Sequence, residues 1–348
     1  MIEKSHTFID LFSGCGGMSL GFEMAGFENI LAIDNWADAL NTYKYNRHGA
    51  KTLCVDLARI ETEDVENAIN GKRVDVIIGG PPCQGFSVAG KRIVDDERNI
   101  LYKSFVRMVQ YFRPKAFVME NVPNILSIGN GIVKKSILSD FEKLGYTVKV
   151  QVLTASDFGV PQNRRRAVFV GLLNGKEFEF PTPIVDVANR VTAYETLGDL
   201  PEESLPDGAD YPVEASCAYQ MYVRTDSKGV YNHEITIHNE QTKSIIAMVP
   251  DGGNYKDLPV ELQQTRKVHI AWTRLNSKKP SFTIDCGHNH HFHYQYNRVP
   301  TVRESARIQS FPDKFIFLGN KSSQLKQVGN AVPPLMAKAI SEQLKKYF

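Results

Sequence analysis

The chain has 348 residues, of which 42% are hydrophobic and 23% charged, and its formal net charge is +2. This composition is typical of a folded protein in water, and the chain lacks the run of about 20 apolar residues that a membrane-spanning helix needs. The five cysteines are scattered and contain no CxxC pair, which favours free thiols in a reducing cytoplasm over a disulfide framework. The length predicts one large domain and a smaller one.

The chain opens with a predicted strand, a glycine turn and a helix. The strand is expected over 7–12 and the helix over 18–25, joined by the tight turn of residues 13–17, Ser-Gly-Cys-Gly-Gly. This order begins the βα units that bind nucleotides. Ser19 occupies the position of the last glycine in the dinucleotide fingerprint GxGxxG, so a dehydrogenase is not favoured.

Two acids follow the next two predicted strands. Strands over 29–33 and 53–55 are followed by Asp34 and Asp56, with a helix predicted over 37–46 between them. Either acid alone could be the N-cap of a helix. Together with the glycine turn, the pair favours an adenosine-type ligand, with hydroxyls and an exocyclic amine, over a polyphosphate.

A cysteine follows the next buried strand. The β-branched run 74–78 predicts a strand buried on both faces, and Pro81-Pro82 then forces a turn that presents Cys83 at the carboxyl end of that strand. Ligands bind at this edge of an open parallel sheet. An isolated cysteine is more often a small buried residue, but the prolines before it and the polar residues after it favour a nucleophilic thiolate. The charged segment 88–100 predicts a long loop.

A carboxylate is expected at the same edge of the sheet. A helix predicted over 100–112 precedes a buried strand over 115–119, which is followed by Glu120. Because this strand is the next one along the chain, Glu120 should lie close to Cys83.

Two arginines enter a later strand. After a strand predicted over 148–153 and a proline turn, Arg164 and Arg166 precede the apolar run 167–172. If they begin that strand, their side chains project to one face because they are two residues apart. A basic triplet is often simply a solvated surface, but its place at a strand entrance favours a site.

Six short motifs stand out between residues 10 and 333. They are Asp10–Gly17, Pro81–Ser87, Glu120-Asn121-Val122, Gln162–Arg166, Arg303–Pro312 and Gln327–Pro333. In this order they resemble the motifs of the DNA cytosine-5 methyltransferases, of the bacterial restriction-modification type. The ordered set is far more specific than any single motif.

The resemblance implies an α/β fold in which a large Rossmann-like, S-adenosylmethionine-dependent methyltransferase domain carries a smaller target-recognition domain. It places the catalytic and cofactor-binding domain at 1–184 and the target-recognition domain at 185–300. The segment 301–348 would return to the catalytic domain, with a helix over 331–344 packing beside the glycine turn.

The resemblance also assigns the catalytic roles. Cys83 would add as a thiolate to C6 of cytosine, because C5 alone is a poor nucleophile. Glu120 would protonate N3, and Arg166 would hold O2 of the base with Arg164 nearby. The activated C5 would then take the methyl group of S-adenosylmethionine. Since a paired base cannot be reached, the cytosine must be flipped out of the duplex, and loop 88–100 would close over it.

The cofactor site follows from the same resemblance. Phe12 would pack on the adenine, Asp34 would bind the ribose, Asp56 the adenine amine, and Asn330 would lie at the methionine end. The full expected set is Phe12, Ser13, Gly14, Gly16, Gly17, Asp34, Asp56, Leu57, Pro82, Leu101, Asn330 and Ala331.

The region 185–300 carries none of the six motifs and is where the family places target recognition. Residues 191–223 contain seven acids and no Lys or Arg, whereas 262–307 contains eight Lys/Arg and two acids among several aromatic residues. Basic residues mixed with aromatics favour a nucleic-acid face. The histidines at 288, 290, 291 and 293 lack the separated ligand pairs of structural zinc sites, so no metal is expected.

Two other functions are possible in principle. An RNA cytosine-5 methyltransferase would share the fold, but the Cys-Phe-Thr signature of the tRNA-directed branch is absent. A non-enzymatic DNA-binding relative should have lost the thiol or the carboxylate, and both are present. We therefore expect a DNA methyltransferase that acts as a monomer on double-stranded DNA in the cytoplasm, associated with the nucleoid. A cognate restriction endonuclease would belong to the same system without a stable complex.

Overall fold

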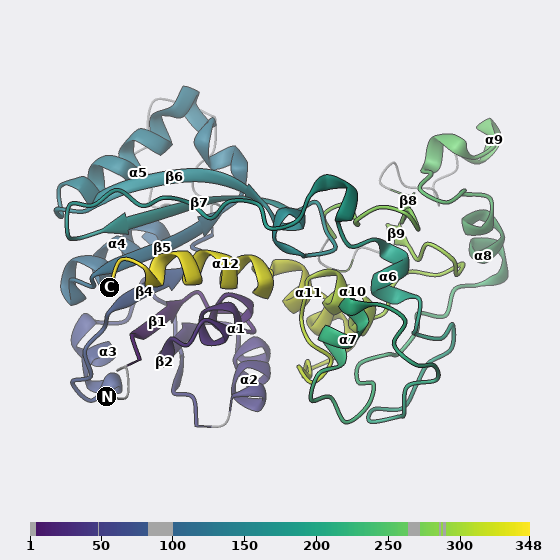
Figure 1. Ribbon diagram of the computed structural model, residues 1–348, viewed down its shortest axis with the longest axis horizontal. Coiled ribbons are helices and arrows are strands. Elements are labelled where there is room, and N and C mark those ends of the chain that lie inside the picture. Colours follow the sequence, from purple (N-terminus) through teal and green to yellow (C-terminus); the bar gives the residue numbers. More distant parts are fainter. Residues whose placement is uncertain (1–4, 48, 83–99, 264–271, 285–286, 288–289) are drawn as a thin grey trace. The chain divides into compact units, whose positions relative to one another are not determined.

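The computed structural model of the protein describes residues 5–47, 49–82, 100–263, 272–284, 287 and 290–348. Cys83 and most of the predicted loop 88–100 lie outside the described residues. The chain forms two compact units (Figure 1). Unit 1 comprises Met1–Thr154, Arg165–Thr182 and Pro334–Phe348, and unit 2 comprises Ala155–Arg164 and Pro183–Pro333.

Apart from residues 183 and 184, which belong to unit 2, these bounds differ from the expected domain bounds in two places. The segment 301–348 is divided, because 301–333 belongs to unit 2 and only Pro334–Phe348 to unit 1. The short segment Ala155–Arg164 also belongs to unit 2, although it precedes a strand of unit 1.

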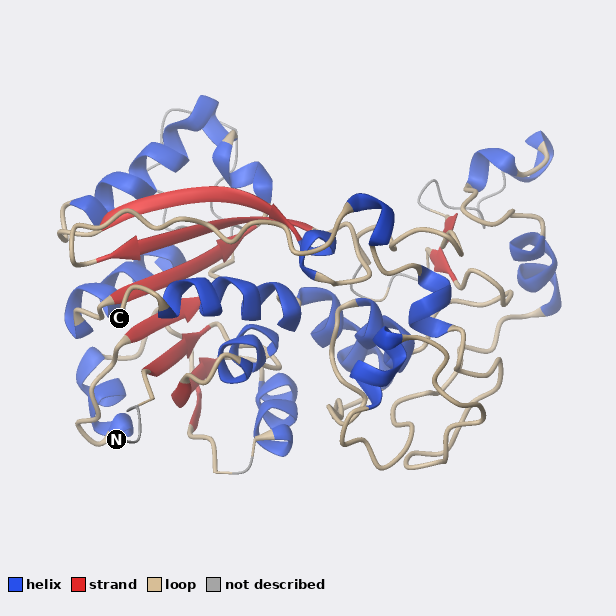
Figure 2. Ribbon diagram, viewed as in Figure 1, coloured by secondary structure: helices blue, strands red, loops and turns tan. Residues whose placement is uncertain are grey.

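Unit 1 is built on one seven-stranded sheet, drawn in red in Figure 2, with the order β3-β2-β1-β4-β5-β7-β6. Its strands are β1 (Thr7–Leu11), β2 (Glu28–Asp34), β3 (Thr52–Cys54), β4 (Val76–Gly79), β5 (Ala116–Asn121), β6 (Thr147–Thr154) and β7 (Arg165–Leu172). The first five are parallel, and β7 runs antiparallel to both β5 and β6. The order reverses between β1 and β4, and ligands of open α/β sheets bind beyond the strand ends at such a reversal.

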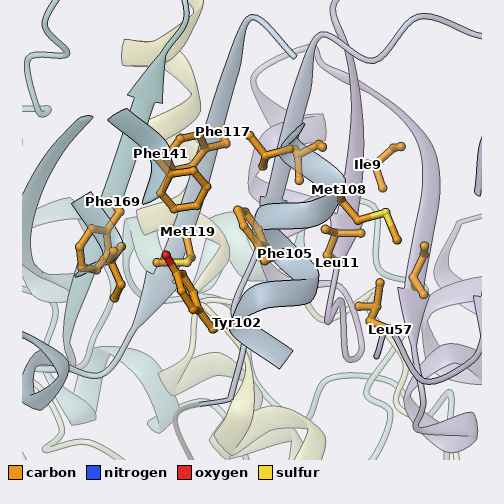
Figure 3. Packing of buried hydrophobic residues seen from close by; sticks show 14 of the residues in the cluster. Ile9, Leu11, Leu57, Tyr102, Phe105, Met108, Phe117, Met119, Phe141 and Phe169 are labelled. Carbon is orange, nitrogen blue, oxygen red and sulfur yellow. The ribbon is translucent and has the colours of Figure 1, made fainter. Parts of the chain in front are cut away.

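One face of this sheet is covered by α3 (Thr62–Ile69), α4 (Ile100–Phe112) and α5 (Ile132–Glu142), whose apolar side chains share one core with the strands. Figure 3 shows the centre of this core. The ring of Phe117 on β5 stacks on Phe141 of α5 with centroids 4.0 Å apart, and Phe105 of α4 meets Phe117 edge-on at 6.1 Å.

The other face is covered by α1 (Gly17–Met24), α2 (Ala37–Asn46) and α12 (Pro334–Lys345). A Cβ at Gly21 of α1 would stand 2.5 Å from the Cβ of Ala337, so α1 and α12 pack with their backbones close together. The last helix therefore packs on the helix that follows the glycine turn, as predicted. It begins at Pro334 and not at 331, because proline is suited to the first turn of a helix and not to its interior.

Unit 2 has little regular structure around a buried ionic core. Its elements are α6 (Ala193–Leu197), α7 (Ala218–Arg224), α8 (Glu240–Ala247), α9 (Val260–Gln263), α10 (Val302–Ile308), α11 (Lys321–Asn330), β8 (Thr273–Arg274) and β9 (His291–Phe292). The guanidinium of Arg307 is fully buried and pairs with Asp199 at 2.5 Å and Asp313 at 2.6 Å. Buried charges are costly unless they are paired. This network therefore fixes α10, which carries Arg307, against the segments that carry Asp199 and Asp313.

Candidate active site

The turn after β1 has an unusual backbone. Phe12, Gly14 and Gly16 all have positive φ, at 59°, 53° and 90°. Such angles are strained for Phe12 and favour glycine at the other two positions. The N–H of Ser13 donates to the carbonyl of Ile33 at 3.1 Å, which ties the turn to the end of β2.

Asp34 holds the turn at its centre. Its Oδ2 accepts the N–H of Gly14 at 2.8 Å, and its Oδ1 accepts the N–H of Trp36 at 2.8 Å. Burial raises the pKa of Asp34, while these two backbone N–H groups lower it. Asp34, the residue predicted to bind the ribose, therefore also shapes the glycine turn.

Asp56 lies beside Asp34 at the end of the neighbouring strand. The N–H of Val55 donates to the carbonyl of Asp34 at 3.0 Å. The Oδ1 of Asp56 accepts the N–H of Ala58 at 2.9 Å, so this acid also caps its own turn. Leu57 is buried in the core of unit 1. Each acid thus accepts backbone N–H groups of a turn, but neither is the N-cap of a helix, the alternative that the sequence left open, because the N-cap of α2 is Trp36 and that of α3 is Glu61. Both acids lie at the ligand edge of the sheet.

The turn fits a polar ligand. Ser13 is buried, and among the described residues its Oγ has no hydrogen-bond partner. Within the same described part of the chain, no heavy atom lies within 4 Å of the place where a Cβ of Gly14 would stand. A buried hydroxyl that needs a partner and an open flank beside it are suited to a nucleoside-like group.

The turn after β4 is joined to the end of β5. A Cβ at Gly79 would stand 2.2 Å from the carbonyl oxygen of Leu11, so only glycine allows β4 to pair this closely with β1. A Cβ at Gly80 would stand 3.0 Å from Oε2 of Glu120. Asn121 donates from Nδ2 to the carbonyl of Pro81 at 2.9 Å. Glu120 therefore lies where the turn toward position 83 begins, as predicted.

Glu120 is paired with Arg166. Nε of Arg166 lies 2.6 Å from Oε1 of Glu120, and both side chains are 13% exposed. The antiparallel pairing of β5 with β7 produces this contact. Arg165, between the two predicted arginines, is exposed.

Arg164 does not begin a strand with Arg166, so that expectation is wrong. β7 begins at Arg165, and Arg164 belongs to unit 2, where its buried Nη2 donates to the carbonyl of Gly329 at 2.8 Å. Asn330, predicted at the methionine end, and Ala331, also predicted to bind the cofactor, follow Gly329 in the same unit.

Of the remaining predicted residues, Gly17 begins α1 and is buried, whereas two others are accessible. Pro82 is exposed and Leu101, in the first turn of α4, is half-buried. Sequence reasoning assigned no role to Asn121, Trp36 or Arg47. Asn121 belongs to the motif Glu120-Asn121-Val122, whereas no local sequence pattern indicates the contacts of Trp36 and Arg47.

The predicted nucleic-acid face over 262–307 is wrong for half of its basic residues. Four of the eight, Arg274, Arg298, Arg303 and Arg307, are at most 5% exposed and bind carbonyl or carboxylate groups inside unit 2. Two of its aromatic residues, Trp272 and Phe292, are buried in a small core cluster. Lys278 and Lys279 are exposed.

The histidines are not gathered as a metal site where the structure describes them. Within the described ranges, no group of three His, Cys, Asp or Glu could hold a metal ion; His288 lies outside these ranges. Burial lowers the pKa of His293 to about 4, and its Nδ1 accepts the N–H groups of Gln295 and Tyr296 at 3.1 Å each. A neutral ring with this role shapes the local turn.

The seven-stranded sheet and its glycine turn define a Rossmann-like methyltransferase fold. A crystal structure from Escherichia coli, described as a DNA modification methyltransferase encoded within a prophage, matches this fold with a TM-score of 0.82 at 27% identity. The match covers 98% of this chain and 99% of that one. No helix in the described part of the chain is long and apolar enough to cross a membrane.

The chain belongs to the C-5 cytosine-specific DNA methylase family, whose profile matches residues 6–346. It is 42% identical to the type II methyltransferase M1.HphI of Haemophilus parahaemolyticus, over 98% of this chain and 87% of that protein. It is 39% identical to the type II methyltransferase M.DdeI of Desulfomicrobium norvegicum, over 98% and 89%. The predicted family, fold class and enzyme class are confirmed, and DNA is supported over RNA as the substrate.

Proposed function

We propose that this DNA cytosine-5 methyltransferase takes its methyl group from S-adenosylmethionine. It would transfer the group to a cytosine flipped out of a short, specific sequence of double-stranded DNA, through a covalent bond between Cys83 and C6. The observation that carries this proposal is the joined edge of β4 and β5, where Glu120 lies beside Gly80 and Asn121 binds the carbonyl of Pro81.

The donor's sulfonium makes its methyl group electrophilic; the protein's part is to bind and orient it. The open flank of Gly14 and the hydroxyl of Ser13 suit the adenosine part, with Asp34 and Asp56 at the adjoining strand ends. Phe12, Gly16, Gly17, Leu57, Pro82, Leu101, Asn330 and Ala331 complete the proposed site. The fit rests on a polar, partly open glycine turn whose Gly14 N–H binds Asp34, and on Asp56, which lies at the end of the neighbouring strand.

At the base, the thiolate of Cys83 forms a bond to C6 while Glu120 delivers a proton to N3, which leaves C5 as an enamine carbon. C5 would form its bond to the methyl carbon as the bond of that carbon to the donor sulfur breaks, and the electron pair of the broken bond would remain on the sulfur, which leaves as a neutral thioether. Loss of the C5 proton to a base, and of the N3 proton back to Glu120, then expels the thiolate and restores the ring. Arg166, held by Glu120, would bind O2 of the base.

Recognition of the DNA sequence is assigned to residues 185–300 of unit 2. We further propose that the protein acts as a monomer within a type II restriction-modification system, in the cytoplasm and at the nucleoid, without a stable complex with an endonuclease. The type II names of its relatives support the system.

The test begins with methylome sequencing of DNA from cells that express the chain, which identifies the recognised sequence. A duplex of that sequence with 5-fluorocytosine at the target position should form a stable covalent adduct, because C5 has no proton to lose. Cys83→Ser should abolish both the adduct and tritium transfer from labelled donor, whereas Cys54→Ser, at an exposed thiol of β3, should change neither. Full activity of the Cys83→Ser variant, or transfer to tRNA in place of duplex DNA, would refute the proposal.

A further inference from the structure

Arg47 binds the far end of the glycine turn and lies outside the six motifs that carry the family resemblance. It is the C-cap residue of α2, and its Nη2 donates to the carbonyl of Gly16 at 2.6 Å. Asp34 binds the N–H of Gly14 at 2.8 Å. The turn is therefore held at two points, Gly14 and Gly16, by side chains of opposite charge, one on a backbone N–H and the other on a backbone carbonyl.

The guanidinium of Arg47 is itself fixed. Its Nε lies 2.7 and 2.9 Å from the two carboxylate oxygens of Glu23 on α1, and its plane lies over the ring of Tyr43 at 4.3 Å. The side chain is only 8% exposed. A buried arginine with a carboxylate, a ring and a carbonyl as partners has little freedom to move.

The two sides of the glycine turn differ in the space that they leave beside the backbone. A Cβ at Gly16 would stand 2.6 Å from Nη1 of Arg47 and from the ring of Tyr43, so these side chains fill the inner side. At Gly14 the corresponding position is open among the described residues. Arg47 and Tyr43 thus close one side of the turn and leave the other to a ligand.

Behind the turn, a hydrogen-bonded chain connects the same helices to β1. The hydroxyl of Tyr43 donates to Ser19 at 2.7 Å, and Ser19 donates to the buried carboxyl of Asp10 at 2.5 Å. Because β1, α1 and α2 all contribute, displacement of the arginine would loosen the turn without opening the main core on the other face of the sheet.

We infer that Arg47 is a positioning residue for the methyl donor. By holding the Gly16 carbonyl it keeps the positive-φ backbone of the turn in the conformation that binds the adenosine end of S-adenosylmethionine. The inference rests on the proposed function of this turn. Arg47 touches neither reacting atom, so its loss should weaken donor binding and leave the chemical step intact.

The test compares Arg47→Met with Arg224→Met, its match in unit 2. Arg224 also binds a buried carboxylate, Asp199, lies over the ring of Tyr211 at 3.9 Å, and donates to the carbonyl of Val213 at 2.9 Å. Both variants remove an arginine side chain that is at most 12% exposed, so both should lower the melting temperature. Only Arg47→Met should raise the Kd for S-adenosylmethionine, measured by calorimetry on the full chain, by about tenfold or more. Its kcat at saturating donor should stay within about threefold of wild type.

Arg47→Lys provides a second variant if the methionine variant folds poorly. The compact ammonium of lysine lacks the several spaced donors with which the guanidinium binds Glu23 and the Gly16 carbonyl together. We therefore expect Arg47→Lys to lose less donor affinity than Arg47→Met, but still to bind more weakly than wild type. Unchanged donor affinity in a folded Arg47 variant, or an equal loss in Arg224→Met, would overturn the role of Arg47 while the wild type still binds the donor. A wild-type chain that binds no S-adenosylmethionine would instead refute the proposed function, and this role with it.

Discussion

The guanidinium of Arg166 and the carboxylate of Glu120 form an ion pair, with Nε and Oε1 2.6 Å apart, at the edge of the sheet where β4 turns toward position 83. The pair joins two residues 46 positions apart through the antiparallel contact of β5 and β7. A guanidinium that already binds Glu120, the proposed general acid, is held in place before a base arrives, which is the preorganisation that catalysis requires.

Arg166→Met should therefore lower turnover on every recognised site alike. A loss of roughly 100-fold or more in kcat is expected, since the variant removes both a proposed contact to the base and the partner that orients Glu120. Arg165→Met is the matched control, because the neighbouring side chain is exposed and should change kcat little. Methylation is measured across a random-sequence duplex library for each variant. A shift in the recognised sequence, with normal turnover, would contradict this role.

Asp34→Ala should weaken donor binding more than it slows the chemical step. The variant removes the acceptor of the Gly14 and Trp36 N–H groups, so both the turn and a proposed ribose contact are lost. We expect the KM for S-adenosylmethionine to rise about tenfold with a smaller change in kcat. Asp56→Ala should behave similarly. Asp64→Ala, at an exposed acid in the first turn of α3, serves as the control. Wild-type donor affinity in both strand-end variants would place the pocket elsewhere.

The sequence was sufficient to predict those helices and strand ends that are marked by a pattern of neighbouring residues. The bounds of α2 and α4 match the predicted 37–46 and 100–112, because apolar residues at helical spacing mark the buried face of each. Glu120 was correctly expected beside the turn after β4, since parallel neighbours end at one edge. The direction of β7 could not be predicted, because alternation is the same in parallel and antiparallel strands.

Buried charge was the main source of error. Arginines between aromatic residues indicated a DNA face, but the partners of Arg274 are carbonyls contributed by α8, the loop after it and the segment 293–296. Arg47 likewise finds Glu23 and Gly16 24 and 31 residues away. Composition gives the charge of a segment, whereas only the fold decides whether that charge faces solvent or carbonyl groups.

Stability should depend on pH through Asp10. Burial raises the pKa of this carboxyl to about 7, against a hydrogen bond from Ser19 that lowers it. An unfolded aspartate releases its proton near 3.8, so between about 4 and 7 the folded chain holds a proton that the unfolded chain has lost. The free energy of unfolding therefore falls as pH rises through this window, by on the order of 4 kcal/mol at most, and is level above it.

Asp10→Asn keeps an oxygen that can accept from Ser19 and removes the titration. The difference in unfolding free energy between wild type and variant should slope with pH between about 4 and 7 and be level below and above this window. Urea unfolding at several pH values, followed by a probe in unit 1, gives this difference and cancels the other titrating groups. Parallel stability curves for the two chains would show that Asp10 is ionised in the folded state.

Arg274 and Lys278, four residues apart in the segment predicted to bind DNA, should have different roles. Arg274 is buried and donates to four backbone carbonyls and to the amide oxygen of Asn297, at 2.6 to 3.1 Å. Arg274→Ala leaves these acceptors without a donor and should destabilise unit 2 by about 3 kcal/mol or more. Lys278→Ala, at an exposed ammonium, should leave stability within about 0.5 kcal/mol.

If Lys278 contacts phosphate, its removal should weaken DNA binding uniformly across sequences and lower the slope of log Kd against log salt by about one. Arg274→Ala, measured below its melting temperature, should keep the wild-type salt slope because its guanidinium does not face solvent. Both variants are compared by thermal unfolding and by fluorescence anisotropy with duplex DNA at several salt concentrations. A reduced salt slope in Arg274→Ala, with unchanged stability, would return this arginine to the nucleic-acid face that the sequence predicted.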